Sequence, residues 1–282
     1  MARIVIAGVG IEYELLGEPG APAVVITPGG RLSKDALGIR TLGDALVAGG
    51  KQVLLWDRPN CGASDICFAG ESEALLQASV LRQLVGELDL GEVVLAGGSA
   101  GARTSLIAAA QYPDMVSHLT LWWISAGIIS LLSLGANYCS DPAVAASMGG
   151  MAAVAALPSF AEQIRRNPRN RQIILSQDVD RFIATMTQWA RAFAPPPDAP
   201  LPGMSRADVD RLTMPVLIFR SSARDLYHPG FVTDFTHALI PHSELIDAPW
   251  TDDEFVQRMT SPDGHFLDWY RLAPAILEFT GR

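Results

Sequence analysis

Short apolar stretches alternate along the chain with longer stretches in which apolar residues recur at helical spacing. The apolar stretches are rich in Val, Ile and Leu, and they predict strands at residues 4–7, 12–16, 23–27, 52–57, 92–96, 119–124, 215–220 and 243–247. The amphipathic stretches predict helices at residues 35–48, 72–88, 102–112 and 266–280. Strands that alternate with helices favour an α/β protein with a mostly parallel central sheet flanked by helices.

The alternation stops in the middle of the chain, where the pattern is helical and no strand is visible. A proline-rich stretch at residues 195–202 marks the exit from this segment. We therefore expect a core formed by residues 1–125 and 213–282, with residues 126–212 inserted as a helical lid over the sheet. The basic run at residues 165–171 is expected to be solvated lid surface, and attraction of an anionic substrate is the alternative.

Composition narrows the class of protein. The 282 residues are 49% hydrophobic and only 18% charged, against a usual charged share of about 25%, which excludes a disordered chain. The net charge of −9 lacks the basic footprint of a nucleic-acid-binding protein and disfavours docking on anionic lipid. The chain has three cysteines, Cys61, Cys67 and Cys139. They are too few and too unevenly placed for a disulfide or zinc framework, which favours a reduced, cytoplasmic protein.

Two segments bear on targeting and membranes. The first residues have the pattern of a strand that enters a hairpin rather than that of a secretory signal. Residues 119–136 carry no charge and approach the length of a short membrane span, but serines and glycines interrupt the run. Its start is typical of a buried strand that leads into a helix. We therefore expect a small-molecule substrate as the partner, and neither nucleic acid nor membrane.

A candidate nucleophile follows the predicted strand at residues 92–96. Gly97, Gly98, Ser99, Ala100 and Gly101 form a G-x-S-x-G motif between that strand and a helix. A sharp turn at this place exposes the serine hydroxyl, and flanking glycines remove the Cβ atoms that would clash. A glycine-rich turn or phosphate loop is the alternative, but no G-K-[ST] accompanies the motif. The motif predicts that Ser99 is a nucleophile.

A serine hydroxyl needs an adjacent base, and the chain offers two candidates for it. His265 lies in a loop between the last predicted strand and the last predicted helix, from which it could reach back over the strand ends. His228 lies close behind Asp225 and is the rival base. We predict His265 as the base. The other histidines are expected to be structural: His118, His237 and His242.

The base needs an acidic residue that orients it. Asp225 follows the strand at residues 215–220, at a carboxyl end, where open α/β sheets place their sites. Asp252 and Asp253 are rivals that are expected to be surface charges. The prediction is therefore a triad in the chain order Ser99, Asp225, His265, and it requires neither a metal nor an organic cofactor.

With these motifs the sequence resembles the α/β-hydrolase superfamily, and within it the lid-bearing esterases, lactonases and meta-cleavage-product hydrolases. Residues 27–31 resemble the family's oxyanion loop, and residues 57–65 resemble its D-x-x-G-x-G-x-S turn. The resemblance implies an α/β-hydrolase fold with an inserted helical lid. It also implies that the N–H groups of Gly30 and Ala100 form the oxyanion hole, aimed at the developing negative charge.

The chain departs from the family pattern at three places. Pro28 stands where the loop usually has a histidine, and Asn60 replaces a turn glycine, which is tolerable because Asn accepts the left-handed region. Between Asp225 and His265 lie 39 residues, more than the resemblance leads us to expect. The additional residues fall after the last predicted strand.

These observations predict a serine hydrolase that cleaves an ester- or lactone-type bond of a small to medium, largely apolar substrate. A carbon–carbon hydrolase of a vinylogous diketone acid is the alternative, with Arg31, Arg103 or the arginines of the lid as candidates to bind its carboxylate. A ligand-binding receptor on a hydrolase fold is a third hypothesis. The side chains expected to line the substrate pocket are Arg31, Trp122, Trp123, Met148, Met151, Phe182, Met186 and Trp189.

Overall fold

A mixed sheet forms the centre of the computed structural model, which describes residues 2–194, 201–222, 224–261 and 266–281. Its strand order is β1-β2-β4-β3-β5-β6-β7-β8; β1 and β2 pair antiparallel, β2 pairs antiparallel with β4, and the other pairs are parallel. The strands are β1 (Ala2–Ile6), β2 (Val9–Leu16), β3 (Ala23–Thr27), β4 (Gln52–Trp56), β5 (Val93–Gly98), β6 (Val116–Trp122), β7 (Val216–Arg220) and β8 (Glu244–Asp247). The predicted α/β class and mostly parallel sheet are confirmed.

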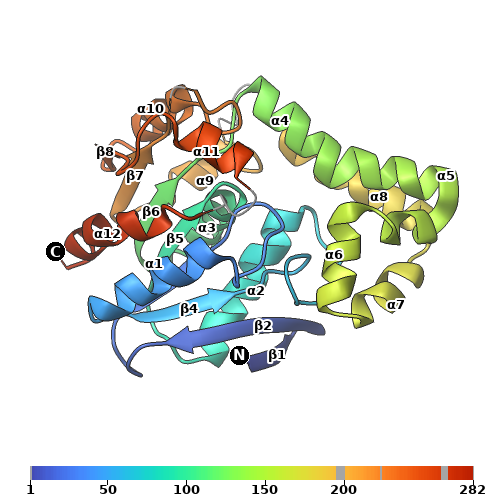
Figure 1. Cartoon of the computed structure of the whole chain (residues 1–282), viewed down its shortest axis with the longest axis horizontal. Coiled ribbons are helices and arrows are strands. Elements are labelled where there is room, and N and C mark those ends of the chain that lie inside the picture. The colour runs from blue at the N-terminus through green and yellow to red at the C-terminus, as the bar shows by residue number, and fades with distance from the viewer. Residues whose placement is uncertain (1, 195–200, 223, 262–265, 282) are drawn as a thin grey trace.

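Helices cover both faces of the sheet (Figure 1). One face packs against α2, α3 and α10, and the opposite face packs against α1 and α12. All residues of β3, β4 and β5 are buried, as expected for strands that are covered on both sides. The helices of the core are α1 (Leu37–Ala48), α2 (Glu73–Glu87), α3 (Ala100–Gln111), α10 (Gly230–Leu239), α11 (Glu254–Thr260) and α12 (Ala273–Phe279). The sequence analysis did not predict α11.

An inserted helical region lies between β6 and β7, as predicted (Figure 1). It has an apolar cluster of its own, which includes Phe160, Phe182 and Trp189. Its helices are α4 (Ile128–Gly135), α5 (Asp141–Ala155), α6 (Pro158–Arg166), α7 (Arg169–Leu175), α8 (Val179–Ala190) and α9 (Arg206–Val209). We call the region from α4 to α8 the lid; its predicted limits at residues 126 and 212 stay a prediction.

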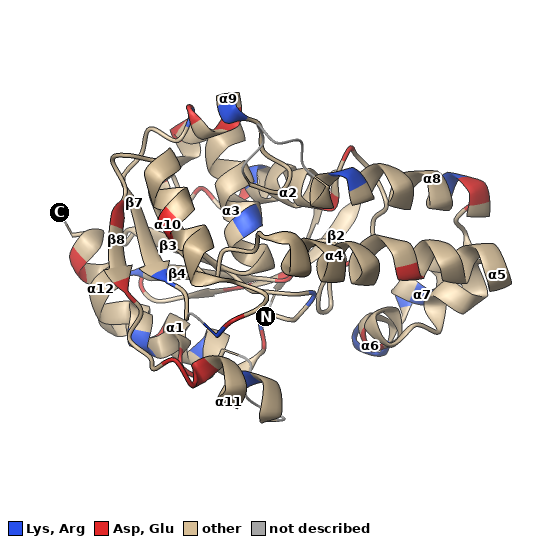
Figure 2. Cartoon of the chain, turned by 90° about the horizontal axis from the view of Figure 1, so that it is seen from above, with Lys and Arg blue, Asp and Glu red and all other residues tan. Residues whose placement is uncertain are grey.

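The start of the lid is unusually apolar. By length and composition, the helical run Ile128–Arg166 could cross a membrane, and Figure 2 shows hardly a charged residue on α4 and α5. Gly149 and Gly150 have non-helical dihedral angles, so the run is kinked in the middle of α5. The helix α5 packs against α7 and α8. The run is therefore part of a folded helical region rather than one straight helix.

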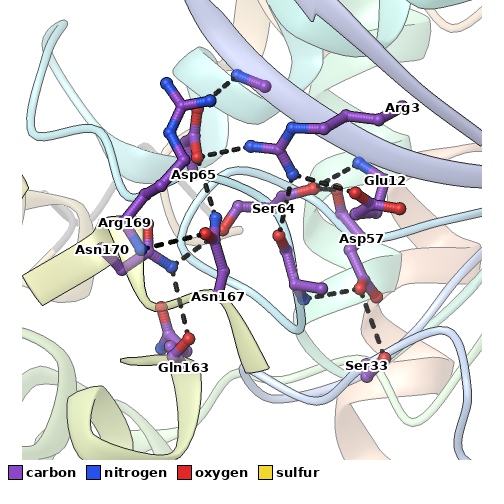
Figure 3. Close-up of polar contacts among 12 residues, drawn as sticks. Arg3, Glu12, Ser33, Asp57, Ser64, Asp65, Gln163, Asn167, Arg169 and Asn170 are labelled. Atoms are coloured by element: carbon purple, nitrogen blue, oxygen red, sulfur yellow. Dashed lines mark hydrogen bonds and ion pairs between the residues drawn. The ribbon is translucent and has the colours of Figure 1, made fainter. Parts of the chain in front are cut away.

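Polar contacts attach the lid to the core at the corner between α6 and α7 (Figure 3). The Asp65 carboxylate accepts hydrogen bonds from the Arg3 guanidinium at 2.5 Å and from the Asn167 side-chain amide at 2.8 Å. The Asn170 side-chain amide donates to the backbone oxygen of Ser64 at 3.0 Å. Asn170 is fully buried, and a buried amide without these partners would be unfavourable by about 1–3 kcal/mol. These bonds therefore fix one end of the lid.

Candidate active site

Ser99 lies at the turn where β5 ends and α3 begins. Its φ of 59° and ψ of −123° are sparsely populated for a residue with a side chain, and such strain is unfavourable by about 1–3 kcal/mol. A Cβ atom at Gly97 would lie 2.6 Å from the carbonyl oxygen of Gly101, and one at Gly101 would overlap the carbonyl oxygen of Thr27. Only glycine fits at these two positions, so the motif forms the turn predicted for a nucleophile.

The side chains of Ser99, His228 and Asp225 form a continuous hydrogen-bonded chain. Nε2 of His228 lies 2.8 Å from Oγ of Ser99, and Nδ1 of His228 lies 2.8 Å from Oδ2 of Asp225. Oδ1 of Asp225 accepts hydrogen bonds from the backbone N–H groups of Tyr227 and His228, at 2.9 and 3.0 Å. Asp225 and His228 are buried, at 1% and 7% exposed. The arrangement matches the roles of nucleophile, base and orienting acid.

The structure therefore places the rival histidine, His228, where the sequence analysis expected His265. His265 lies outside the described residues. The reason is local. The carboxylate of Asp225 accepts hydrogen bonds from the backbone N–H groups of Tyr227 and His228, and these bonds hold the following residues back over the carboxylate. That fold brings the ring of the residue three positions later onto the same carboxylate. A signal for it was present in the sequence, as an Asp-x-x-His spacing directly after a buried strand.

Arg258 is a residue of this site that the sequence analysis missed. Its Nη2 lies 2.6 Å from Oδ2 of Asp225, the same oxygen that contacts His228. The Arg258 side chain is 5% exposed, and its guanidinium carbon lies 4.0 Å from the ring centre of Trp123. Arg258 belongs to α11, so the additional length between Asp225 and residue 265 builds a helix that contacts the acid.

Burial and charge together set the ionisation of the three groups. Burial opposes the ionisation of Asp225, but the hydrogen bonds and charges of His228 and Arg258 outweigh it and hold the pKa of Asp225 well below its usual value. Burial lowers the pKa of His228 below 6.5; Asp225 opposes this shift, and the charge of Arg258 adds to it. His228 is therefore neutral at pH 7 and able to accept the proton of Ser99.

Glu254 adds a further titratable group behind Arg258. Its Oε2 lies 3.5 Å from Nη1 of Arg258, and both side chains are about 5% exposed. Burial raises the pKa of Glu254 to about 7; Arg258 opposes the shift, and the charges of Asp225 and Asp268 add to it. The charge beside Arg258 therefore changes near neutral pH.

A pocket of about 160 Å³ opens over Ser99 and His228. The ring of Trp123 stacks on His228 at a centroid distance of 5.8 Å and forms part of the wall. Most of the lining is apolar, and several of its members were not predicted. The lining residues are Gly29, Gly30, Leu32, Ser99, Trp123, Tyr227, His228, Arg258, Met259 and Phe266.

Trp123 is the predicted pocket residue that lines this pocket. Trp122 is fully buried and packs edge-on against Trp269 in the core, whereas Met148 is 85% exposed on the lid surface. Arg31 lies between core and lid, beside Glu73. The remaining predicted pocket residues pack inside the apolar cluster of the lid: Met151, Phe182, Met186 and Trp189. The structure does not bring these residues to the Ser99 pocket.

The predicted oxyanion donors lie on two sides of Ser99. Gly30 lines the pocket, and Ala100 is the first residue of α3, where a backbone N–H has no partner within the helix. Arg58 donates from Nη2 to the carbonyl oxygen of Gly30 at 2.5 Å, so an arginine fixes the loop in which Pro28 replaces the family's histidine. The assignment of both N–H groups as oxyanion donors stays a prediction.

The other histidines and acids that the sequence analysis weighed lie elsewhere. Nδ1 of His237 contacts Oγ of Ser243 at 2.8 Å, and Nε2 of His242 contacts the carbonyl oxygen of Met214 at 3.1 Å. Asp253 pairs with Arg224 on the surface. The described residues contain no cluster of three or more His, Cys, Asp or Glu side chains that could hold a metal ion.

Comparisons with known proteins agree with this fold. A profile of the family described as "alpha/beta hydrolase fold" matches residues 22–129. The enol-lactonase of Burkholderia xenovorans is 19% identical and superposes with a TM-score of 0.64, covering 100% of both chains. The chain therefore has the α/β-hydrolase fold. An esterase from Exiguobacterium antarcticum is 17% identical, with a TM-score of 0.61 over 99% of this chain and 98% of the esterase.

Similarity to curated relatives is limited to part of this chain. The 2-hydroxy-6-oxononadienedioate/2-hydroxy-6-oxononatrienedioate hydrolase of Escherichia coli is 33% identical over 90 residues. That segment covers 32% of this chain and 31% of the relative, so the match spans about a third of either protein. At the identities of the structural neighbours, the likeness shows the fold and not the substrate.

Proposed function

We propose that this α/β hydrolase is a serine hydrolase that cleaves an ester- or lactone-type bond through an acyl-enzyme on Ser99. The observation that carries the proposal is the hydrogen-bonded chain from Ser99 through His228 to Asp225, with both contacts of His228 at 2.8 Å. A hydroxyl, a neutral imidazole and an ionised carboxylate in this order are the groups that acyl transfer requires.

In the proposed mechanism, Oγ of Ser99 attacks the substrate carbonyl while Nε2 of His228 takes its proton. Asp225 accepts the Nδ1–H of His228, which keeps Nε2 free to act as the base and stabilises the imidazolium that forms. The N–H groups of Gly30 and Ala100 receive the negative charge of the tetrahedral intermediate. His228 then gives the proton to the leaving oxygen, and the same residue activates the water that releases the acyl group.

The pocket over Ser99 supports a substrate of small to medium size. Its volume of about 160 Å³ and its mostly apolar lining fit a short acyl chain or a single ring. Carbon–carbon cleavage of a vinylogous diketone acid is the second candidate, and the similarity over 90 residues to the Escherichia coli hydrolase favours it. Both reactions use the same serine, histidine and aspartate, so the substrate separates them.

The test is steady-state hydrolysis of 4-nitrophenyl acetate and butyrate by the wild type and three variants. Ser99→Ala and His228→Ala should each lower kcat by at least about 10³-fold with an unchanged urea unfolding midpoint, because the triad acts as a unit. His237→Ala is the matched control, since His237 bonds to Ser243 away from the pocket. Equal rates for wild type and Ser99→Ala would remove the enzyme hypothesis and leave the receptor hypothesis.

His265→Ala decides between the two histidines. If His228 is the base, His265→Ala keeps a substantial rate while His228→Ala loses it. The reverse outcome would restore the assignment made from the sequence and would reject the role proposed for His228. A diketone acid of the meta-cleavage type, assayed with the same preparations, tests the second candidate reaction.

A further inference from the structure

Three arginines converge on the space between the core and the lid, beside the candidate active site. Arg31 directly follows the loop residue Gly30, and Arg58 donates to the carbonyl oxygen of Gly30. Arg103 lies on α3 one turn after Ser99, to whose carbonyl oxygen its backbone N–H donates at 3.2 Å. Each arginine is thus attached to a segment that carries the nucleophile or a predicted oxyanion donor.

The guanidinium groups are buried but poorly satisfied. Arg58 is 1% exposed and the Arg31 side chain is 7% exposed. Among the described residues, Nε and both Nη atoms of Arg31, Nε and Nη1 of Arg103, and Nε of Arg58 have no hydrogen-bond partner. Native proteins rarely leave buried donors unpaired, and buried charges are rarer still without a counter-charge.

Among the residues that the structure describes, Glu73 is the carboxylate that forms an ion pair with one of these arginines. Nη2 of Arg31 lies 3.1 Å from Oε1 of Glu73, an ion pair without hydrogen-bond geometry. Arg103 has no ion pair within the described part of the chain, and burial lowers its pKa. The charged groups that act on the buried Tyr138 are these three arginines and Glu73. The space between core and lid therefore has an excess of positive charge.

The rings of the lid cover the arginines without neutralising them. The guanidinium carbon of Arg103 lies 4.7 Å from the ring centre of Phe193, and that of Arg31 lies 4.9 and 5.2 Å from those of Tyr138 and Phe160. Cation–π contacts compensate part of the lost hydration, but they leave the N–H groups unbonded. An anion between the core and the lid would satisfy both the charge and the donors.

We propose that Arg31 and Arg103, supported by Arg58, bind a carboxylate group of the substrate on the lid side of Ser99. The inference rests on the proposed function, because it places the anion on the molecule that Ser99 attacks. The planar guanidinium fork matches a carboxylate with two parallel hydrogen bonds, which favours a carboxylate over a neutral polar group. The predicted substrate class is an ester or lactone of a small carboxylic acid that carries a second, free carboxylate.

The space beside Arg103 constrains how the carboxylate enters. The narrow cavity between Arg103, Glu73, Trp189 and Phe193 has about 10 Å³ of open space, which is room for about one water molecule. A carboxylate is larger than this space, so the proposed binding requires Arg103 or Phe193 to move aside.

The test compares esters that differ only in a terminal charge. The pairs are 4-nitrophenyl hydrogen succinate, glutarate and adipate against the 4-nitrophenyl alkanoates with the same number of acyl carbons. In at least one pair the wild-type kcat/KM should favour the charged ester by at least about tenfold, because the neutral analogue leaves the guanidinium groups unpaired. Arg103→Gln should abolish that preference, and Arg103→Lys should restore part of it, since lysine keeps the charge.

Arg165→Gln is the matched control, because Arg165 is an exposed lid arginine paired with Glu162. It should leave the preference for the charged ester unchanged. Equal kcat/KM values within every pair, or a preference that survives both Arg103→Gln and Arg31→Gln, would overturn the proposed carboxylate site. That result would leave the proposed serine hydrolase in place, because the reaction proposed for neutral esters uses Ser99, His228 and Asp225 and needs no carboxylate on the substrate.

Binding to the inactive variant separates the two proposals. Calorimetry of Ser99→Ala with succinate, glutarate and adipate should show binding that is lost in the Ser99→Ala/Arg103→Gln double variant. Glutaramide, which has the shape of glutarate without its charge, should not bind. If the dicarboxylates bind in this way but the wild type hydrolyses no ester, the proposed reaction is refuted and the carboxylate site is retained. If none of the three dicarboxylates binds, the carboxylate site is rejected.

Discussion

Replacing Arg258 by Met tests whether this arginine keeps the candidate base neutral. Nη2 of Arg258 and Nδ1 of His228 contact the same oxygen of Asp225, at 2.6 and 2.8 Å, so the two nitrogens are at most 5.4 Å apart. Met keeps much of the packing against Trp123 and removes the charge. Asp225 keeps the N–H bonds of Tyr227 and His228, so it stays ionised.

The size of the effect follows from the distance between the two charges. At an effective dielectric constant of about 20, two unit charges about 5 Å apart interact by about 3 kcal/mol. This energy is an upper limit on the free energy by which Arg258 disfavours the protonated form of His228, because the guanidinium charge is delocalised and Asp225 relaxes. We therefore expect the Arg258→Met substitution to raise the pKa of His228. The protonated form of His228 cannot accept the proton of Ser99.

The assay is the pH dependence of kcat/KM for 4-nitrophenyl butyrate from about pH 5 to about pH 9, where the acidic limb reports the base in the free enzyme. In Arg258→Met the acidic limb should move to higher pH, and activity should recover at alkaline pH. Arg258→Lys, which keeps the charge, should show a smaller shift. An acidic limb that coincides with that of the wild type, or a uniform loss of rate at every pH, would refute the electrostatic reasoning.

Further predictions concern the acid, the group behind the arginine and the turn. Asp225→Asn should lower kcat by about 10⁴-fold, because an amide favours the wrong tautomer of the histidine; steady-state kinetics with an unchanged urea midpoint checks this. Burial raises the pKa of Glu254 to about 7, so this carboxyl group takes up a proton on folding. Its contribution to the free energy of unfolding is fully present below the pKa that Glu254 has in the unfolded chain, and it is lost as the pH rises through 7. The free energy of unfolding of Glu254→Gln, relative to that of the wild type, should therefore be higher at about pH 8 than at about pH 5, by at most about 3 kcal/mol. Urea unfolding measures it, and the same difference between variant and wild type at both pH values would contradict this reasoning. Gly101→Ala should unfold or strongly destabilise the protein, because the new Cβ overlaps the carbonyl oxygen of Thr27; circular dichroism during thermal unfolding measures it.

The strands of the core and most of its helices were predictable because their signals are local. β3 was predicted with the limits observed, since a short run of Val and Ile between polar residues has few other stable conformations. The turn at Ser99 was predictable because glycine is required on both sides of it, for reasons of backbone geometry alone. In both cases a few adjacent residues determine the structure, whatever packs around them.

The candidate base and the pocket depend instead on contacts between distant segments. The order serine, aspartate, histidine is satisfied by His228 and by His265 alike, so chain order did not separate them. For the lid, an amphipathic helix such as α8 gives the same pattern whether its apolar side faces a substrate or other helices. Phe182, Met186 and Trp189 face the lid's own cluster, and only the packed structure makes this visible.

The additional residues after β8 change how the site is stabilised. The acid and the base lie on a single loop after β7, and α11 supplies Arg258, which contacts the same carboxylate oxygen of Asp225 as His228 does. Because Arg258 bonds to Asp225 and packs on Trp123, which in turn stacks on His228, these four side chains form a closed set of contacts. The position of α11 therefore affects both the orientation and the ionisation of the base, and the additional residues after β8 form the helix that has this effect.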